Sequence, residues 1–222
     1  MNQSSWDLLL NSFWPIVQGA LVGTIPLALA SFAIGLVLAV VFALMRLSKV
    51  KLVSGIARVY ISVVRGTPLL VQLFVIFYGL PSIGLVFDSW PSAVVAFSIN
   101  VGGYAAEVVR AAILSVPKGQ WEAAYMIGMS HRRALTRIIL PQAARVSVPP
   151  LSNTFISLVK DTSLASLILV TELFRQAQKV AAFSGDFMLL YLEAALVYWI
   201  VCLVLSSGQP LLEKRLDRYV AH

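Results

Sequence analysis

The sequence has little charge and almost no cysteine. Of its 222 residues, 12% are Asp, Glu, Lys or Arg, which is about half the charged share of a typical soluble domain. With so few charged residues in a chain of 222, we expect no separate soluble domain. The single cysteine, Cys202, excludes a disulfide within the chain. Because Cys202 lies inside an apolar run, we expect it to be a small packing residue.

The sequence also lacks patterns that are typical of nucleotide binding, of nucleic-acid binding and of a cleaved signal peptide. Without a Gly-x-x-x-x-Gly-Lys-Ser/Thr loop, the chain cannot itself cradle ATP in that way. The net charge of +7 comes from basic residues that flank apolar segments, as in inner-membrane proteins, and they form no basic face for nucleic acid. Residues 1–10 have no basic residue before their apolar part, so we expect no cleaved signal peptide.

Long apolar runs are what the sequence does have, since 59% of its residues are hydrophobic. A membrane-spanning helix needs about 20 mostly apolar residues, and several runs qualify. We therefore expect an all-α polytopic membrane protein, one domain over residues 1–222 with five spans. The first run exceeds one perpendicular crossing, so it must tilt, bend at Pro26 or begin at the membrane surface. The expected spans are residues 13–45, 59–80, 92–114, 148–169 and 187–205.

The charges of the connections indicate an orientation. Most Lys and Arg residues lie after the first span, after the third span and in the C-terminal tail that includes Arg218. Basic connections stay on the cytoplasmic side, so we expect the N-terminus outside and the C-terminus inside a bacterial inner membrane. Residues 81–91 and 171–186 then face outward. Five spans cannot divide into two inverted halves, so we expect a second copy or a similar chain to complete any pathway.

The polar segment 118–141 predicts a compact protrusion between the third and fourth spans. Its first half is a short helix, and Gly128 suits a helix end with positive φ. We expect Ser130 to cap a second helix, residues 131–140, which stops near Pro141. An amphipathic helix lying on the membrane surface is the alternative.

Small and apolar side chains on the first of these helices favour contact with another protein. Ala123 and Ala124 allow close backbone approach. Trp121, Tyr125 and Met126 offer apolar anchors of the kind enriched in interfaces.

Six charged residues fall within or at the edges of the spans. Each costs about 2.5–3.5 kcal/mol near the centre of a spanning helix, so we expect them to face protein or water. Glu107 and Arg110, three residues apart, suit a structural pair on one helix face, whereas Lys160 and Asp161 point in different directions. Glu193, nearer the outer edge, is expected to be partly wet. The sixth of these charged residues is Arg65.

Other intramembrane polar groups suggest a route for a small polar solute. Gly66 and Pro68 favour local unwinding of the second span, because the residue before proline avoids the helical region. A zwitterion needs donors and acceptors in a mostly apolar wall, and an intramembrane charge is a functional candidate by default. The candidate pathway residues are Thr67, Gln72, Asn100, Tyr104, Glu107, Lys160, Asp161 and Thr162.

One spacing connects these features to a known family. Glu122-Ala123-Ala124, three residues, Gly128, nine residues and then Ile138-x-Leu140-Pro141 resembles the signature loop of the membrane subunits of bacterial ATP-binding-cassette importers. Similar stretches cover most of residues 60–175, among them 65–72, 104–107, 142–145 and 157–164. They resemble the polar-amino-acid branch, which includes histidine, arginine, glutamine and cystine importers, and are most similar to the cystine importer permeases.

The resemblance implies a type I importer permease fold, with five transmembrane helices and a cytoplasmic coupling-helix pair. It implies a separate ATPase subunit that binds ATP and Mg, a soluble binding protein docking near residues 81–91 and 171–186, and a second permease chain. The permease itself would be non-catalytic, with no cofactor or metal of its own. The residues implied in coupling to the ATPase are Glu122, Ala123, Ala124, Tyr125, Met126, Gly128, Arg132 and Arg133.

Alternatives remain at this stage. A secondary transporter or channel for a small polar solute would use Glu107 and Asp161 as an ion relay, but it leaves the bent cytoplasmic helices unexplained. A non-transporting membrane scaffold would tolerate changes at the buried charges. Within the importer class, the cargo could be a different small cationic solute instead of a polar amino acid.

Overall fold

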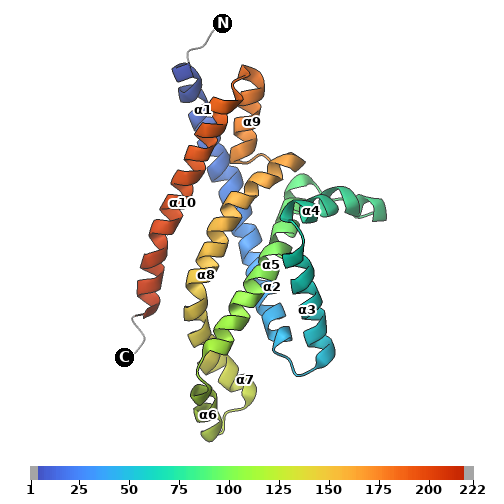
Figure 1. Ribbon diagram of the computed structural model, residues 1–222, viewed down its shortest axis with the longest axis vertical. Helices are drawn as coiled ribbons and strands as arrows, with labels where there is room; N and C mark the ends of the chain where they lie inside the picture. Colours follow the sequence, from blue (N-terminus) through green and yellow to red (C-terminus); the bar gives the residue numbers. More distant parts are fainter. Residues whose placement is uncertain (1–4, 218–222) are drawn as a thin grey trace.

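The computed structural model describes residues 5–217, which are helical apart from short turns (Figure 1). Residues 1–4 and Arg218 of the basic tail lie outside this part, and side chains are described up to residue 210. The longest continuous helix joins α1 (Ser5–Gly19), a π turn (Ala20–Thr24) and α2 (Ile25–Arg46). This helix contains the whole of the first predicted span.

Two other long helices and two bent pairs make up most of the remaining bundle. Among the described residues, Ser5–Arg46, Ser89–Ser115 (α5) and Phe187–Pro210 of α10 (Phe187–Asp217) are long and apolar enough to cross a membrane, and the bent pairs bring the count to at most five. The first pair bends by 106° between Lys51–Gly66 and Leu69–Ile83, and the second by 47° between His131–Ile168 and Leu173–Ser184.

The predicted second span, residues 59–80, therefore lies on two helices instead of one. It starts within α3 (Lys51–Gly66) and continues through α4 (Leu69–Phe74) and a π turn (Val75–Gly79) to a 3-10 turn (Leu80–Ile83). Thr67 is extended, with φ −119° and ψ 144°, as expected before a proline. The unwinding predicted at Gly66–Pro68 is thus confirmed, and it is a sharp corner.

Prolines within the helices are accommodated by widened turns. A proline lacks an N–H and its ring clashes with the carbonyl four residues earlier. Directly before Pro26, Pro81 and Pro141, a π turn shifts the hydrogen bond to the carbonyl five residues back, as from Leu140 N to Leu135 O. The predicted stop near Pro141 is therefore wrong, because α7 (His131–Ala134) runs through the π turn Leu135–Ile139 into α8 (Leu140–Asp161).

The core lies where α5 packs along α2 and against α3 and α8. Glycines allow this close approach. A Cβ at Gly102 would lie 2.6 Å from the Tyr60 hydroxyl, and one at Gly103 would lie 2.5 Å from a Val64 methyl group. Tyr60 in turn stacks on Phe42, with ring centroids 3.8 Å apart. The small residues of α5 thus serve contacts within the chain.

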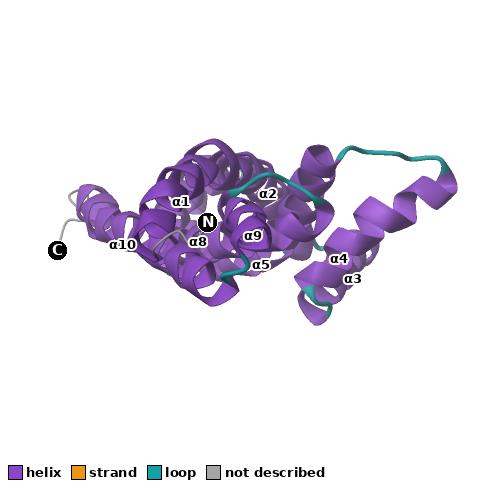
Figure 2. Ribbon diagram, turned by 90° about the horizontal axis from the view of Figure 1, so that it is seen from above, coloured by secondary structure: helices purple, strands orange, loops and turns teal. Residues whose placement is uncertain are grey.

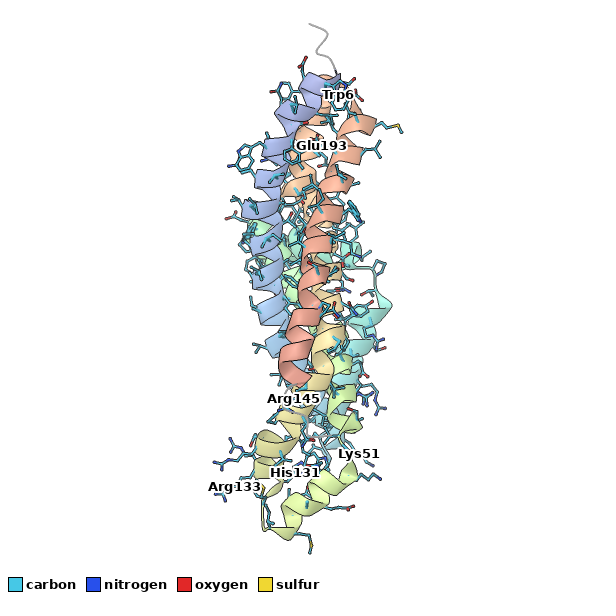
Figure 3. The ribbon with its side chains drawn as sticks, turned by 90° about the vertical axis from the view of Figure 1, so that its left-hand side faces the viewer. Trp6, Lys51, His131, Arg133, Arg145 and Glu193 are labelled. Atoms are coloured by element: carbon cyan, nitrogen blue, oxygen red, sulfur yellow. The ribbon has the colours of Figure 1, made fainter. Side chains whose placement is uncertain are left out.

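The two ends of the bundle are formed by different helices and turns (Figures 1 and 3). One end holds α6 (Lys118–Met126), α7 and the α2–α3 turn, and α10 descends toward it. The opposite end holds the start of α1, α9 (Leu173–Ser184) and the start of α10, which pack as a three-helix group. The connections predicted to be cytoplasmic therefore share one end.

Candidate functional site

A cavity of 430 Å³ opens beside the corner between α3 and α4. The corner, the middle of α5 and the second half of α8 contribute its walls. Four of the predicted pathway residues meet here, although they come from segments far apart in the sequence. The lining residues are Thr67, Pro68, Leu69, Asn100, Val101, Tyr104, Asn153, Thr154, Ser157, Leu158 and Asp161.

Gln72 holds the corner against α5 without lining the cavity itself. Its Nε2 donates to the Val64 carbonyl (2.8 Å), the Thr67 carbonyl (3.1 Å) and the Thr67 hydroxyl (2.9 Å). Its Oε1 accepts from Asn100 Nδ2 at 3.1 Å. Gln72 therefore positions two lining side chains, Thr67 and Asn100.

Asp161 is the one carboxylate among the described residues that line the cavity, and it is partly buried. The other polar lining groups are amides and hydroxyls. Tyr104 lies beneath the Arg65 guanidinium, whose carbon is 5.5 Å from the ring centroid. The wall thus offers one negative charge, neutral donors and acceptors, and a cation close to its aromatic member, a combination suited to a polar solute of low net charge.

Sequence reasoning missed the α8 wall, which Asn153, Thr154 and Ser157 provide. A signal was present, because Asn153, Ser157 and Asp161 are spaced by four residues and share one helix face.

Other predicted pathway residues lie away from the cavity. Lys160 is exposed and does not line it, consistent with the different directions expected for Lys160 and Asp161. Thr162 is buried and donates to the Val159 carbonyl at 2.7 Å.

Glu107 also lies elsewhere, in an ionic cluster. Its Oε2 accepts from Arg110 Nε at 3.0 Å and Nη2 at 2.7 Å, which confirms the predicted pair. Its Oε1 lies 3.8 Å from Arg46 Nε. This cluster joins α5 to the end of α2, so the geometry of Glu107 is that of the structural pairing.

The α6–α7 protrusion forms a second candidate site. Gly128 has φ +77°, as predicted, and its N–H donates to the Tyr125 carbonyl at 2.9 Å. Ser130 occupies the N-cap position of α7, but its side chain makes no capping hydrogen bond. The two helices are held together instead by His131, which stacks on Trp121 at 4.9 Å and lies 2.8 Å from the Tyr125 hydroxyl.

The predicted coupling residues divide by exposure. Ala124 is buried, and Trp121 packs with the core of the protrusion, so both stabilise it from within. Met126 is 87% exposed and Ile127 75% exposed, giving an apolar tip that the sequence located only in part. The remaining predicted coupling residues are all exposed: Glu122, Ala123, Tyr125, Gly128, Arg132 and Arg133.

A polar cluster at the opposite end was not anticipated. Glu172 is fully buried and accepts from the amides of Phe174 (2.9 Å) and Arg175 (2.6 Å), capping α9. The hydroxyls of Tyr198 (2.8 Å) and Thr24 (3.3 Å) also donate to it. One carboxylate thereby joins the first helix, α9 and α10.

Glu193 strengthens the same three-helix group. It was expected to be partly wet, which is wrong: it is 6% exposed and accepts from Ser12 Oγ at 2.6 Å. Figure 3 places it beside α1 near the end that carries Trp6. Packing of α1 over α10 covers it, and such a contact between distant segments cannot be read from a span boundary.

Comparisons with known proteins identify the relatives of this chain. Residues 32–218 match the family described as binding-protein-dependent transport system inner membrane component. The chain is 60% identical over 217 residues to the L-cystine transport system permease protein TcyB of Bacillus subtilis (strain 168), covering 97% of this chain and 93% of that protein. It is 38% identical over 225 residues to the probable amino-acid ABC transporter permease protein YckA of the same strain, covering 99% and 100%.

A solved structure extends the likeness to three dimensions. The crystal structure of an amino acid ABC transporter with histidines superposes with a TM-score of 0.88 and 33% identity, over 97% of this chain and 100% of the other.

Proposed function

The chain belongs to the family of binding-protein-dependent transport system inner membrane components, and from this premise we propose that it imports a polar amino acid, with cystine as the first candidate. A protein of this family is a non-catalytic, multi-pass permease of the inner membrane. An ATPase that binds ATP and a soluble binding protein are its partners. The observation that carries the substrate proposal is the 60% identity to a cystine permease over almost the whole chain.

The cavity chemistry supports a zwitterion over a strongly cationic solute. Asp161 suits the ammonium group of an amino acid, and amide and hydroxyl groups such as those of Asn100 and Asn153 suit its carboxylate. One carboxylate per cavity does not neutralise a solute with a further positive charge, and Arg65 near Tyr104 would repel it. The volume of 430 Å³ lies within the ordinary range for small-molecule sites, about 300–1,000 Å³.

The pathway is proposed to need two permease chains. The cavity lies beside the α3–α4 corner, which extends away from the rest of the bundle in Figures 1 and 2. A second copy or a similar chain would cover this side. We propose five membrane crossings per chain, the bent pairs counting as one each, with the basic end and the C-terminus in the cytoplasm.

The protrusion is proposed to couple ATP hydrolysis to transport. The apolar tip at Met126 and Ile127 suits a groove of the ATPase subunit, with Arg132 and Arg133 at its rim. Closure of two ATPases would bring two such protrusions together. Because α7 runs without a break into α8, this displacement would pass directly to the helix that carries Asp161.

One reconstitution tests both the proposed substrate and the proposed dependence on ATP. The permease, its ATPase and its binding protein are placed in proteoliposomes, and ATP-dependent uptake of cystine, arginine and glutamine is measured with and without an uncoupler. We expect cystine uptake that needs ATP and the binding protein and resists the uncoupler. Uptake without the ATPase, or uptake abolished by the uncoupler, would instead identify a secondary transporter.

Two variants assign the sites in this assay. A charge-assisted hydrogen bond contributes about 1.5–3 kcal/mol, so Asp161→Asn should weaken transport affinity about tenfold or more, while Lys49→Gln, at an exposed residue of the α2–α3 turn, should not. Gly128→Asp should reduce copurification of the ATPase. Gly185→Asp is its matched control, since Gly185 has φ +79°, open space around it and a position at the other end. Normal affinity in the first variant, or normal copurification in the second, would remove that site from the proposal.

A further inference from the structure

The continuous helix formed by α7, the π turn Leu135–Ile139 and α8 has one place where it bends easily. In the π turn a hydrogen bond reaches the carbonyl five residues back, and the following Pro141 has no N–H to donate. The Thr136 hydroxyl donates back to the Arg132 carbonyl at 2.9 Å, a contact that often bends helices. Widened turns and prolines are the usual sites of helix bending. A displacement that enters at α7 would therefore be absorbed at this turn unless another element braced it.

Helix α6 lies alongside this turn. It packs against both α7 and the π turn. Its Trp121 joins the apolar cluster that contains Ile139 of the π turn and Ala143 of α8. Two polar contacts then connect α6 to the continuous helix, one on each side of the bend.

The contact before the π turn is made by His131 of α7. Its ring stacks on the Trp121 ring, with centroids 4.9 Å apart and planes 13° from parallel. Its Nδ1 lies 2.8 Å from the Tyr125 hydroxyl. Trp121 and Tyr125 are four residues apart and so share one face of α6, and in Figure 3 His131 lies between the two helices. A single imidazole thus holds two consecutive turns of α6.

The contact beyond the π turn is made by Gln142, in the first turn of α8. Its Nε2 donates to Gln120 Oε1 of α6 at 3.2 Å. The same Nε2 donates to the Ile138 carbonyl, within the π turn, at 3.0 Å. Gln142 therefore joins α6, the π turn and α8 through one amide group.

We infer that α6 is a splint across the π turn, and that His131 and Gln142 are the positioning residues that fasten it on either side. This inference rests on the proposed function, in which the ATPase displaces the protrusion. With both contacts in place, a displacement of α6 enters the continuous helix on each side of the turn, so α8 moves as a whole and carries Asp161 with it. With the contacts removed, the same displacement bends the helix at the π turn, and ATP is hydrolysed with less movement of the cavity wall.

The competing explanation is that the two contacts only fold the protrusion. Two observations favour the splint. The contacts lie on opposite sides of the π turn, whereas a contact on one side would suffice to hold α6 against α7. The packing of Trp121 and the buried Ala124 already fixes α6 to the core of the protrusion, so the two exposed polar contacts add little to its stability.

The test uses the whole importer, with its ATPase and binding protein, in proteoliposomes. ATP hydrolysis and cystine uptake are measured in the same vesicles for the wild type and for the double variant His131→Ala, Gln142→Ala. The matched control is Gln18→Ala, a glutamine truncation at an exposed residue of α1. We expect the ATP consumed per cystine imported to rise about threefold or more in the double variant, because the loss of one ordinary hydrogen bond shifts a two-state equilibrium by about that factor. Gln18→Ala should keep the wild-type ratio, and the double variant should still copurify with the ATPase.

A milder variant separates positioning from folding. His131→Phe keeps a ring that stacks on Trp121 and removes the nitrogen that faces the Tyr125 hydroxyl. Its ratio of ATP to cystine should lie between those of the wild type and the double variant, with the ATPase still bound.

Three results would overturn the inference. The first is a wild-type ratio in the double variant. The second is ATP hydrolysis and uptake that fall in proportion, as expected if the contacts only fold the protrusion. The third is loss of ATPase copurification in both the double variant and His131→Phe, which would assign the contacts to docking. Each leaves the proposed function standing as long as the wild type imports cystine with ATP; a wild type that does not would remove the proposed function as well.

Discussion

The two bends of the molecule are built in opposite ways. At the 106° corner between α3 and α4, Gly66, Thr67 and Pro68 are exposed, and beyond the adjoining backbone no described atom lies within 4 Å of a Cβ placed on Gly66. At the 47° bend before α9, Val170 and Glu172 are buried, and four donors satisfy the Glu172 carboxylate. Leu169 even adopts φ +67° there, a conformation that a leucine keeps only when its surroundings hold it.

The two bends thus differ in how firmly the rest of the chain holds them. The exposed corner lines the cavity and is held mainly by the hydrogen bonds of Gln72, and regions with exposed hydrogen bonds and little packing have low local stability. The buried bend joins three helices into one unit. Transport would then change the first corner and leave the second rigid.

The largest expected effect comes from removing the Glu172 carboxylate. Glu172→Ala leaves two amides and a tyrosine hydroxyl, all partly buried, without their acceptor, so the free energy of unfolding in detergent should fall by about 3 kcal/mol. Gln72→Ala at the exposed corner should cost less than about 1 kcal/mol. Thermal and denaturant unfolding of both purified variants measure this difference, and equal losses would erase the contrast.

The next largest effect is expected from adding a methyl group at a tightly packed glycine. A Cβ on Gly23 would lie 2.5 Å from the Thr171 carbonyl oxygen and 2.6 Å from Glu172 Cα, so Gly23→Ala should cost about 2 kcal/mol through overpacking. Gly66→Ala meets open space and should change stability by about 0.5 kcal/mol or less. A stable Gly23→Ala protein would show that the bend yields more easily than its packing indicates.

A single hydroxyl gives the smallest effect. Tyr198→Phe removes one donor to Glu172 and leaves the other contacts in place, so it should cost about 1 kcal/mol. Tyr78→Phe, on the exposed arm beyond α4, is 60% exposed and should change stability by less than about 0.5 kcal/mol. If the two losses measured in the same detergent agree, Tyr198 does not support the bend.

Much of the helical plan could be predicted because apolar runs and charged connections are local features. The expected corner at Gly66–Pro68 followed from proline sterics in the same way. The continuation through Pro141 did not, because a proline stops a helix unless the preceding turn widens, and that choice depends on packing.

Prediction of the candidate sites was also limited to what local sequence features indicate. Thr67, Asn100, Tyr104 and Asp161 were predicted from residue type, and the cavity brings them together. Glu172 was missed because its role depends on Thr24 and Tyr198, which are distant in the sequence. Glu193 was misplaced for the same reason, since Ser12 covers it from another helix.

The uncovered apolar tip at Met126 and Ile127 has a consequence for how the importer is made. In the orientation proposed above, a copy inserted into the membrane ahead of its ATPase would present these two side chains to the cytosol, where chaperones and proteases capture exposed apolar groups. Permease without a bound ATPase should therefore be degraded quickly. The supply of ATPase would then set how many complete importers a cell keeps.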